Sequence, residues 1–312
     1  MTVPPFARTV VLLNPASASG AAGRRWRAVA PLAATIFSNL DVIESRAPGE
    51  LRRAAATAAR NAEPPLLLAA GGDGTSHEVV NGLVDAGPTT AALGWLPIGS
   101  GNDLARSVGV PLDAATALRW YRHPNVARID AGTVRYRTPE GIPTTRAFGN
   151  SVTLGLSTDV LAIVRRGRRL GSLSYFGATV RALTRQRPID LELEIDGAAR
   201  SAPATRILSV TNGASFGGGM RVTPGARLDD GRLDLLWFGG TSRLATLLIF
   251  PRIYWGGHLT HPAVNTVRLE RLVIRGEAIR AFEADGELIE ATGPVELGIL
   301  PGGLRIARGR LD

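Results

Sequence analysis

The 312-residue chain contains no cysteine, which excludes disulfides, zinc–thiolate sites and cysteine nucleophiles. It contains no lysine either, so all 36 basic residues are arginine and the lysine of a Walker A loop is excluded. Long apolar runs are absent too: the best candidate, residues 244–255, is interrupted by Pro251 and Arg252, so it could lie at a membrane surface but could not cross a bilayer. The N-terminus lacks the pattern of a signal peptide, and we expect a cytoplasmic protein.

Positive charge is in excess. The formal net charge of +9 favours an anionic partner such as a nucleotide, a nucleic acid or a membrane surface. Residues 160–187 carry no acidic residue and seven arginines, at positions 165, 166, 168, 169, 181, 185 and 187. Leu170, Leu173, Tyr175 and Phe176 lie among them. Two interpretations stay open for this segment, a solvated helical face and a patch that faces phospholipid.

The first 120 residues alternate between strand-like and helix-like patterns. Strands are expected at 9–14, 41–45, 66–70 and 92–97, with helices near 22–37 and 48–61 between them. A further helix follows GGDGT, where Thr75 is the expected N-cap and Glu78 completes a capping box. This alternation predicts an α/β domain with a parallel sheet covered by helices on both faces.

After about residue 125 the pattern changes to successive strands with period-two alternation and glycine turns, interrupted by helical stretches near 157–185 and 241–255. We therefore expect two domains, an α/β nucleotide-binding domain at 1–125 and a mostly antiparallel, β-rich acceptor-binding domain at 126–312. The last strands, about 294–312, could pack back near the first domain.

Three glycine loops follow predicted strands of the first domain. They are NPASASG (14–20, the first loop), GGDGTSHE (71–78, the second loop) and PIGSGND (97–103, the third loop). Ligands of open α/β sheets bind outside the carboxyl ends of the strands, and backbone N–H groups at helix starts bind phosphate without lysine. Neither G-x-G-x-x-G nor Walker A occurs, so these loops predict a nucleotide polyphosphate site of another type.

The three loops resemble the signature segments of the diacylglycerol kinase catalytic-domain family, which includes bacterial lipid kinases and the sphingosine and ceramide kinases. The likeness continues in GGGMRVTPGARLDDGRLDLLW, GGHLTHPAV and FEADGELIE, so it runs nearly end to end. It implies an NAD-kinase-like and diacylglycerol-kinase-like fold and an ATP site. The nucleotide contacts carried over are Asn14, Pro15, Ala16, Ser17, Ser45, Gly72, Asp73, Gly74, Thr75, Ser76, His77, Glu78 and Ser100. Ser45 and Ser100 stand where the family often has threonine, and His77 where asparagine is common.

The resemblance also implies the catalytic carboxylates. The late ADGE segment places Glu287 as the general base, with Asp285 close behind, although an Asp-Gly pair is also a common hairpin turn. Asp73 would hold Mg²⁺ or orient the acceptor hydroxyl.

A structural metal loop is implied at ARLDDGRLD. Its ligands would be the carbonyl of Arg227, the side chain of Asp230 and the carbonyl of Arg232, an oxygen set suited to Mg²⁺ or Ca²⁺. An aspartate network made by Asp103 and Asp130 would connect this ion to the cleft.

The leading hypothesis is a lipid kinase that uses ATP and Mg²⁺ to phosphorylate the hydroxyl of diacylglycerol or a related lipid, and that visits an anionic membrane surface as a peripheral protein. No nucleic acid partner is expected, and a homodimer stays open. Two alternatives remain. An NAD-kinase-like enzyme also uses a GGDGT turn before a β-domain, and a nucleotide-binding or membrane-binding module could have lost catalysis.

Overall fold

The computed structural model describes residues 6–63, 65–166 and 172–310, without the side chains of residues 162, 164–166, 172–176, 179 and 180. Two compact units divide the chain. Unit 1 comprises Met1–Ala131 and Pro301–Asp312, and unit 2 comprises Gly132–Leu300. Two long strands, β5 (Asn125–Arg137) and β16 (Thr292–Arg308), contribute residues to both units.

Unit 1 contains a parallel sheet in the order β2-β1-β3-β4, and the last residues of β16 extend it alongside β4. The strands are β1 (Arg8–Leu13), β2 (Leu40–Glu44), β3 (Pro65–Gly71) and β4 (Ala92–Pro97). Every residue of β3 and β4 is buried, as expected for central strands of a sheet covered on both faces.

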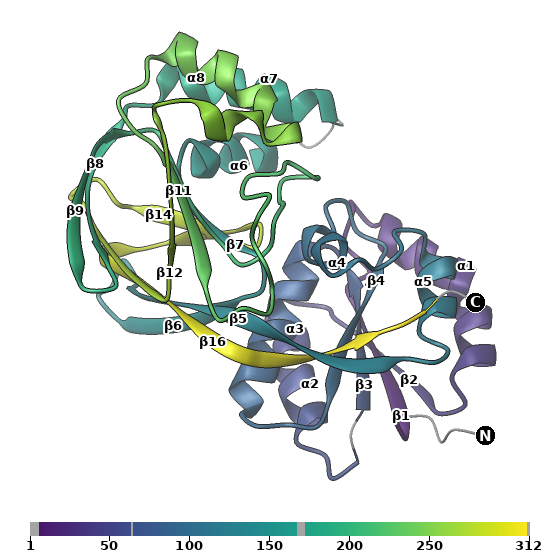
Figure 1. The fold of residues 1–312 in the computed structure, drawn as a ribbon. Coiled ribbons are helices and arrows are strands. Elements are labelled where there is room, and N and C mark those ends of the chain that lie inside the picture. The colour runs from purple at the N-terminus through teal and green to yellow at the C-terminus, as the bar shows by residue number, and fades with distance from the viewer. Residues whose placement is uncertain (1–5, 64, 167–171, 311–312) are drawn as a thin grey trace. The chain divides into compact units, whose positions relative to one another are not determined.

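Five helices cover this sheet: α1 (Ala21–Ile36), α2 (Glu50–Ala59), α3 (Asp73–Ala86), α4 (Asp103–Val108) and α5 (Ala114–Trp120). Parallel strands are joined by right-handed crossovers, and the strand order reverses direction after β2. Accordingly α2 packs against α3 on one face, while α1 packs against α5 on the other (Figure 1).

One local prediction about α3 was wrong. The helix begins at Asp73 with Gly72 as its N-cap, so Thr75 lies inside the first turn and is no cap. Glu78 does not turn back to close a capping box. Its carboxylate accepts from the backbone N–H groups of Gly49, Leu51 and Arg52 and thereby caps α2. The sequence pattern was right about a capping carboxylate and wrong about the helix that it caps.

Unit 2 contains two layers of antiparallel strands. The first is a six-stranded sheet in the order β12-β11-β10-β7-β14-β15. In the second layer, β13 pairs with β16 and β8, β8 pairs with β9, and β5 pairs with β6. The remaining bounds are β6 (Pro143–Phe148), β7 (Ser151–Gly155), β8 (Ile189–Ile195), β9 (Ala198–Thr205), β10 (Ile207–Thr211), β11 (Leu233–Phe238), β12 (Val264–Leu269), β13 (Arg271–Arg275), β14 (Ala281–Ala284) and β15 (Glu287–Glu290).

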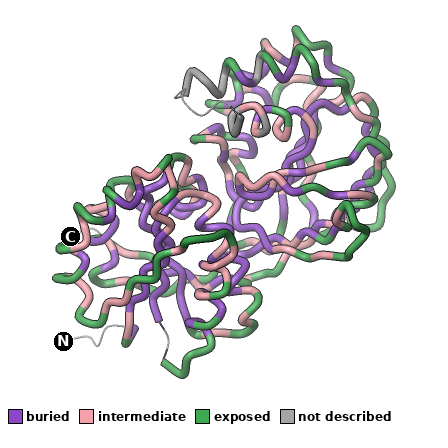
Figure 2. The backbone as a smooth tube through the Cα atoms, turned by 180° about the vertical axis from the view of Figure 1, so that it is seen from behind, coloured by how far each residue is buried: buried purple, intermediate pink, exposed green. Residues whose placement is uncertain are grey.

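The alternation of residues along β10 and β11 shows how unit 2 is layered. Leu208, Val210 and Leu235 belong to the core between the two strand layers. Ile207 and Leu236 point to the opposite face and join a second core. Because side chains of a strand alternate between faces, a run of buried residues on both faces means that both faces are covered. The buried strands are visible as purple segments in Figure 2.

Helices cover the outer face of the six-stranded sheet. They are α6 (Leu156–Arg166), α7 (Ser172–Arg185), α8 (Arg243–Ile249) and the 3₁₀ segments η1 (Phe250–Trp255) and η2 (Gly257–Thr260). Their buried side chains, among them Val160, Leu183 and Phe250, form the second core with the sheet. The predicted fold class, an α/β unit with a parallel sheet and a mostly antiparallel β-rich unit, is confirmed.

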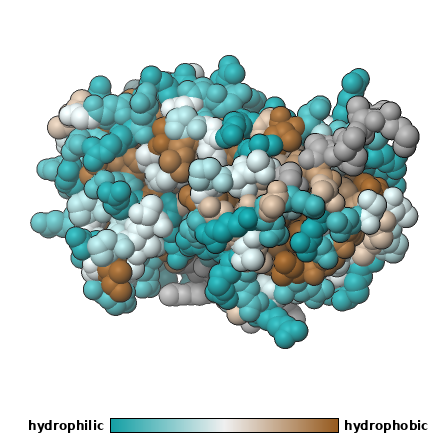
Figure 3. Space-filling view, turned by 90° about the horizontal axis from the view of Figure 1, so that it is seen from below, coloured by the Kyte–Doolittle hydropathy of each residue, from teal (hydrophilic) through white to brown (hydrophobic). Residues whose placement is uncertain are grey.

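None of the described helices combines the length and apolar character that a membrane crossing requires. On the surface that Figure 3 displays, hydrophobic residues lie in separate patches between hydrophilic ones.

Candidate functional site

The ends of β1, β3 and β4 lie next to one another in unit 1. Leu13 of β1 lies opposite Ala70 of β3, and Gly71 of β3 lies opposite Pro97 of β4. The three glycine loops, which follow these strands, therefore meet at one edge of the sheet (Figure 1). This edge is where open α/β sheets bind their ligands.

The second and third loops touch through their backbones. The N–H of Gly99 donates to the carbonyl of Gly71 at 2.9 Å. A Cβ atom on Gly99 would lie 2.2 Å from the Cα of Gly72, closer than non-bonded carbon atoms can approach, whereas a Cβ on Gly72 would meet its nearest neighbour at 3.5 Å. Position 99 thus requires glycine for the packing of one loop on the other.

Asp73 connects the start of α3 to the third loop. Its Oδ1 accepts from the N–H of Asp103 at 2.6 Å, and its Oδ2 fills the space that a Cβ on Gly101 would occupy. Asp103 is the first residue of α4, and its side chain is buried. The structure therefore brings Asp73 and Asp103 together and gives Asp73 a positioning role within the loops.

The first loop is turned tightly and touches the second. The Asn14 N–H donates to the carbonyl of Ala70, and Asn14 Oδ1 accepts from the N–H of Ala16 at 3.1 Å. Ala18 has φ 52°, which is uncommon for a residue with a Cβ. The hydroxyl of Ser17 lies 3.4 Å from that of Thr75. The Asn14 and Ser17 predicted for the nucleotide site are thus tied to the loops at the same sheet edge.

Arg25 of α1 is a residue that the sequence analysis missed. Its Nη1 donates to the carbonyls of Ile98 and Gly99, at 2.9 and 3.2 Å, and holds the third loop against α1. One of many arginines in an amphipathic helix carries no sequence signal of such a role.

The first turn of α3 is suited to an anion. The opening N–H groups of a helix have no acceptor inside it, and the helix dipole adds partial positive charge there. No side chain caps the N-terminus of α3, and the N-cap is a glycine. Thr75 and Ser76 are buried beside this turn, and the Ser76 hydroxyl donates to the Gly72 carbonyl. Phosphate groups bind helix N-termini of this kind without a lysine.

The other predicted nucleotide residues have varied surroundings. His77 is buried, with its Nε2 3.3 Å from Nδ2 of Asn81. Glu78 anchors α2, as described above. Ser45 follows β2 and donates its N–H to the carbonyl of Leu13, while Ser100 is exposed in the third loop. Their contacts with a nucleotide stay predictions, as do those of Pro15 and Gly74.

In unit 2, Asp285 occupies the turn of the β14–β15 hairpin with φ 47°. Its carboxylate is buried and accepts from three consecutive backbone N–H groups, those of Gly149, Asn150 and Ser151, at 2.8 to 3.0 Å. The carboxylate therefore joins the hairpin to the turn between β6 and β7. Because the Asp285 carboxylate already accepts three backbone hydrogen bonds, it is less suited to accept a proton, which favours Glu287 over Asp285 as the general base.

Glu287 opens β15 opposite Ala284 and is half-buried. Its neighbour Glu283 accepts from the hydroxyl of Thr153 at 2.6 Å and from the N–H of Gly286 at 2.9 Å. The carboxylates of Glu283 and Asp285 thus connect the hairpin that carries Glu287 to β7 and to the turn before it. Its role as base stays a prediction.

The predicted aspartate network is only partly visible. Asp130 is buried in β5, and its Oδ1 accepts from the N–H of Gly302 at 2.7 Å, while Arg128 donates to the carbonyl of the same residue. Asp130 thus secures β16 to β5 within unit 1. Its connection to Asp103 stays a prediction.

The predicted metal loop has an oxygen-only donor set. Asp230 Oδ1 accepts from the N–H of Arg232 at 3.1 Å, and its Oδ2 pairs with Arg268. Burial raises the pKa of the nearby Asp234, and the charge of Asp230 raises it further, while Arg268 lowers it. Two carboxylates thus share one guanidinium.

The described residues contain no cluster of three or more His, Cys, Asp or Glu that could hold a metal. An ion here would need the carbonyls of Arg227 and Arg232, a set that fits Mg²⁺ or Ca²⁺.

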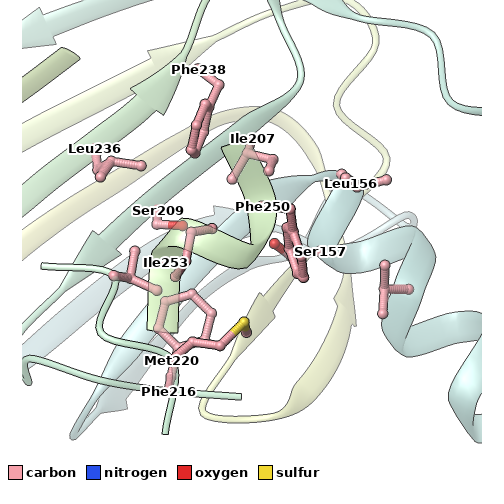
Figure 4. A pocket seen from close by; sticks show the side chains of 12 residues that line it. Leu156, Ser157, Ile207, Ser209, Phe216, Met220, Leu236, Phe238, Phe250 and Ile253 are labelled. Carbon is pink, nitrogen blue, oxygen red and sulfur yellow. The ribbon is translucent and has the colours of Figure 1, made fainter. Parts of the chain in front are cut away.

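Unit 2 contains an apolar cavity between the six-stranded sheet and its helices. Figure 4 shows side chains that converge on it from strands, from α6 and from η1. The lining residues are Leu156, Ser157, Val160, Ile207, Ser209, Phe216, Met220, Val222, Leu236, Phe238, Phe250 and Ile253.

Two serines are the polar groups of this cavity. Ser209 is fully buried in β10, and its hydroxyl has no hydrogen-bond partner in the described part of the chain. An unpaired buried hydroxyl costs stability, and one that faces a cavity can be satisfied by a ligand. His258 supports the wall: it is buried, stacks on Phe238 and hydrogen-bonds the Val222 carbonyl at 2.8 Å through Nε2. No sequence pattern marked the cavity, because its lining comes from five separated segments.

The basic segment predicted to face phospholipid is described only in part. Arg168, Arg169 and Leu170 lie outside the described residues, and the side chains of Arg165, Arg166, Leu173, Tyr175 and Phe176 lie outside the description. Arg181, Arg185 and Arg187 are exposed.

Family models match both parts of the chain. The diacylglycerol kinase catalytic domain matches residues 8–134, and the YegS C-terminal NAD kinase beta sandwich-like domain matches residues 150–308. The segments that carried the resemblance in the sequence thus fall within two recognised domains.

Curated relatives cover most of the chain. A diacylglycerol kinase of Mycobacterium tuberculosis is 29% identical over 311 residues, 97% of this chain and 96% of the relative. A diacylglycerol kinase of Bacillus subtilis is 31% identical over 246 residues, 77% of this chain and 76% of the relative. Among solved structures, a diacylglycerol kinase of Bacillus anthracis superposes with a TM-score of 0.76 at 22% identity, over 97% of this chain and 98% of that one. That superposition supports the fold.

Proposed function

The chain belongs to the diacylglycerol kinase catalytic-domain family, a family of lipid kinases, and on that premise we propose that it transfers the γ-phosphate of ATP to the hydroxyl of diacylglycerol or a related lipid. Unit 1 supplies the nucleotide site, and unit 2 supplies the acceptor site and the general base.

The nucleotide part of the proposal depends on the three glycine loops of unit 1. The proposal assigns the phosphate oxygens to backbone N–H groups at the start of α3 and to Asn14 and Ser17 of the first loop, and it is supported by the contacts between these loops. Asp73 and Arg25 hold the third loop against the other two. Positioning of this kind is most of what a phosphotransferase has to provide, because the chemistry occurs between the two bound ligands.

The acceptor part is carried by one observation, the apolar cavity of unit 2. Ten of its twelve lining residues are hydrophobic, and the other two are Ser157 and Ser209. A dinucleotide would meet an unfavourable surface there, whereas an acyl chain would bury its methylene groups at about 0.8 kcal/mol each. The cavity therefore favours a lipid acceptor over the NAD-kinase-like alternative.

The proposed transfer is an in-line displacement. Glu287 accepts the proton of the acceptor hydroxyl while the hydroxyl oxygen forms a bond to the γ-phosphorus, the bond between the γ-phosphorus and the bridging oxygen breaks, and ADP leaves. Asp73 orients the phosphate loops and is placed at the α3 N-terminus, where a carboxylate can hold Mg²⁺. When bound, Mg²⁺ neutralises charge on the phosphates. Asp230 with the carbonyls of Arg227 and Arg232 would hold the second, structural ion.

The acceptor lipid resides in a membrane, so the proposal includes peripheral association of a cytoplasmic protein with an anionic bilayer. The excess of arginine supports this association electrostatically.

The test is incubation of the full chain with γ-labelled ATP and Mg²⁺ in three separate arms. These contain dispersed diacylglycerol, a total lipid extract and NAD. We expect label in a lipid product, and we expect Asp73→Asn to reduce its rate by roughly 10²-fold or more, because the carboxylate both positions the loops and stabilises charge. Label in NAD alone would establish the NAD-kinase-like alternative. ATP binding without label in any arm would establish a non-catalytic module.

A further inference from the structure

Exposed apolar side chains are concentrated on one short stretch of unit 2. Of the eleven large hydrophobic residues that are exposed in the described chain, five lie between residues 244 and 259. We name the surface that they form the α8–η1 face; its residues are Leu244, Leu248, Tyr254, Trp255 and Leu259. Leu244, Leu248 and Trp255 are 66, 64 and 65% exposed. Leu244 and Leu248 are four residues apart in α8, which places them on the same side of the helix.

The surroundings of this face are basic. The sequence from 235 to 269 contains no acidic residue, and Arg243 and Arg252 are exposed within it. Arg221 is exposed next to η1, since its N–H donates to the carbonyl of Ile253. α7, with exposed Arg181 and Arg185, packs against α8. Leucine, tyrosine and tryptophan bordered by arginine are typical of a surface that enters the interfacial region of a bilayer.

The same elements also line the cavity. Phe250 and Ile253 of η1 face inward and belong to its lining, while Tyr254 and Trp255 of η1 face outward. Figure 4 shows Phe250 and Ile253 on the inner side of this segment. A segment that is apolar on both sides packs one face against the protein core and exposes the other apolar face to water, which indicates an interaction surface.

We propose that the α8–η1 face inserts into the surface of an anionic phospholipid bilayer and places the cavity behind it next to the lipid phase. The membrane assignment stands on charge and exposure, and its role in delivering the acceptor rests on the proposed function. A second copy of the chain is disfavoured as occupant, because two such faces would bring arginines together without a carboxylate to pair with them.

The first test is co-sedimentation of the full chain with vesicles of phosphatidylcholine, alone or mixed with phosphatidylglycerol. The parent should bind the mixed vesicles, and binding should weaken as salt is raised. The variant Leu244→Gln/Leu248→Gln/Trp255→Gln should bind them at least roughly tenfold more weakly, since the replaced side chains no longer transfer apolar area from water. The matched control, Leu112→Gln/Ile142→Gln, changes apolar residues that are exposed elsewhere and should bind like the parent.

A second test uses tryptophan fluorescence. Of the five tryptophans, Trp26, Trp95 and Trp237 are buried, Trp120 is half-buried in α5 of unit 1 and Trp255 is exposed. Brominated phospholipid in the vesicles should therefore quench the parent more strongly than Trp255→Phe. Trp255→Phe keeps an aromatic ring and should still bind the vesicles.

A kinase assay separates this proposal from the proposed function. With a short-chain acceptor below its micelle concentration, the triple variant should phosphorylate at the parent rate, whereas with acceptor in vesicles it should be slower by a factor similar to the loss in binding. If neither protein phosphorylates lipid, the proposed function fails while the vesicle result still decides the membrane face. Equal vesicle binding by parent and triple variant would overturn the proposal. So would a parent dimer that the triple variant converts to a monomer without change in vesicle binding.

Discussion

Replacing Gly99 by alanine is expected to destabilise unit 1, whereas the same replacement at Gly72 is expected to be tolerated. Neither glycine has a positive φ, so the space around each position is the main difference between them, although Gly72 is also the N-cap of α3. A Cβ on Gly99 would lie 2.2 Å from the Cα and 2.4 Å from the N of Gly72. A Cβ on Gly72 would have no neighbour closer than 3.5 Å.

The magnitude follows from this geometry. Carbon atoms in contact need about 3.5 Å or more, so the second and third loops would have to separate by more than about 1 Å. Overpacking costs roughly 1–3 kcal/mol, and loss of the bond from the Gly99 N–H to the Gly71 carbonyl adds about 1 kcal/mol. We therefore expect Gly99→Ala to lower the free energy of unfolding by about 2–4 kcal/mol, and Gly72→Ala to lower it by less than about 1 kcal/mol.

Calorimetry measures this directly. At about 2–4 °C per kcal/mol for a unit of this size, Gly99→Ala should lower the midpoint of the unit 1 transition by roughly 5–15 °C. Isothermal titration with ATP should show weakened binding as well, because the third loop is displaced from the sheet edge. A Gly99→Ala protein that unfolds at the parent temperature would refute the argument that close loop packing requires this glycine.

Three other predictions concern the remaining polar groups. Glu287→Gln should keep ATP binding and lower lipid phosphorylation by about 10²- to 10⁴-fold. Asp285→Asn should mainly lower thermal stability, because it weakens the hydrogen bonds to the Gly149–Ser151 backbone. If Asp285→Asn lost only catalysis and unfolded like the parent, Asp285 would be the base. Asp230→Ala should lower activity without preventing ATP binding, and a calcium or magnesium titration that finds no tight site in the parent would refute the ion. Burial lowers the pKa of His258 below its ordinary 6.5, so near that pH the unfolded chain binds a proton that the folded chain does not. The free energy of unfolding should therefore fall as pH drops below about 6.5, by at most about 1.4 kcal/mol per pH unit. Urea unfolding at several pH values should show this slope reduced in His258→Gln.

The glycine motifs located the candidate nucleotide site in the sequence, but they did not give the physical reason for each glycine. The sequence assigned the glycines to close approach between backbone and phosphate. In the structure, Gly99 is required by the backbone of Gly72, and Gly101 leaves room for the carboxylate of Asp73. Close packing among the loops therefore accounts for these two glycines, at the sheet edge where we propose that a nucleotide binds.

The late Asp-Gly pair offers a second lesson. From local pattern it was either a hairpin turn or part of a catalytic segment, and the structure shows the hairpin. The Asp285 carboxylate reaches backbone groups more than 130 residues earlier in the chain, and no local pattern could have signalled that partner.

The sequence by itself determined the alternation of strands and helices and the change to antiparallel strands, because periodicity and turn residues act over a few neighbouring positions. Its glycine loops and late segments carried the resemblance to the family. Only the tertiary structure decided that Glu78 caps α2 and not its own helix, that Gly99 must be a glycine, and that five segments enclose a cavity with Ser209 at its wall. The same holds for the α8–η1 face. In the sequence its residues form one apolar run with Phe250 and Ile253, and only the packing shows which of them line the cavity and which are exposed. Such features join residues distant in the chain, and their contacts are set by how whole elements pack, which no local pattern records.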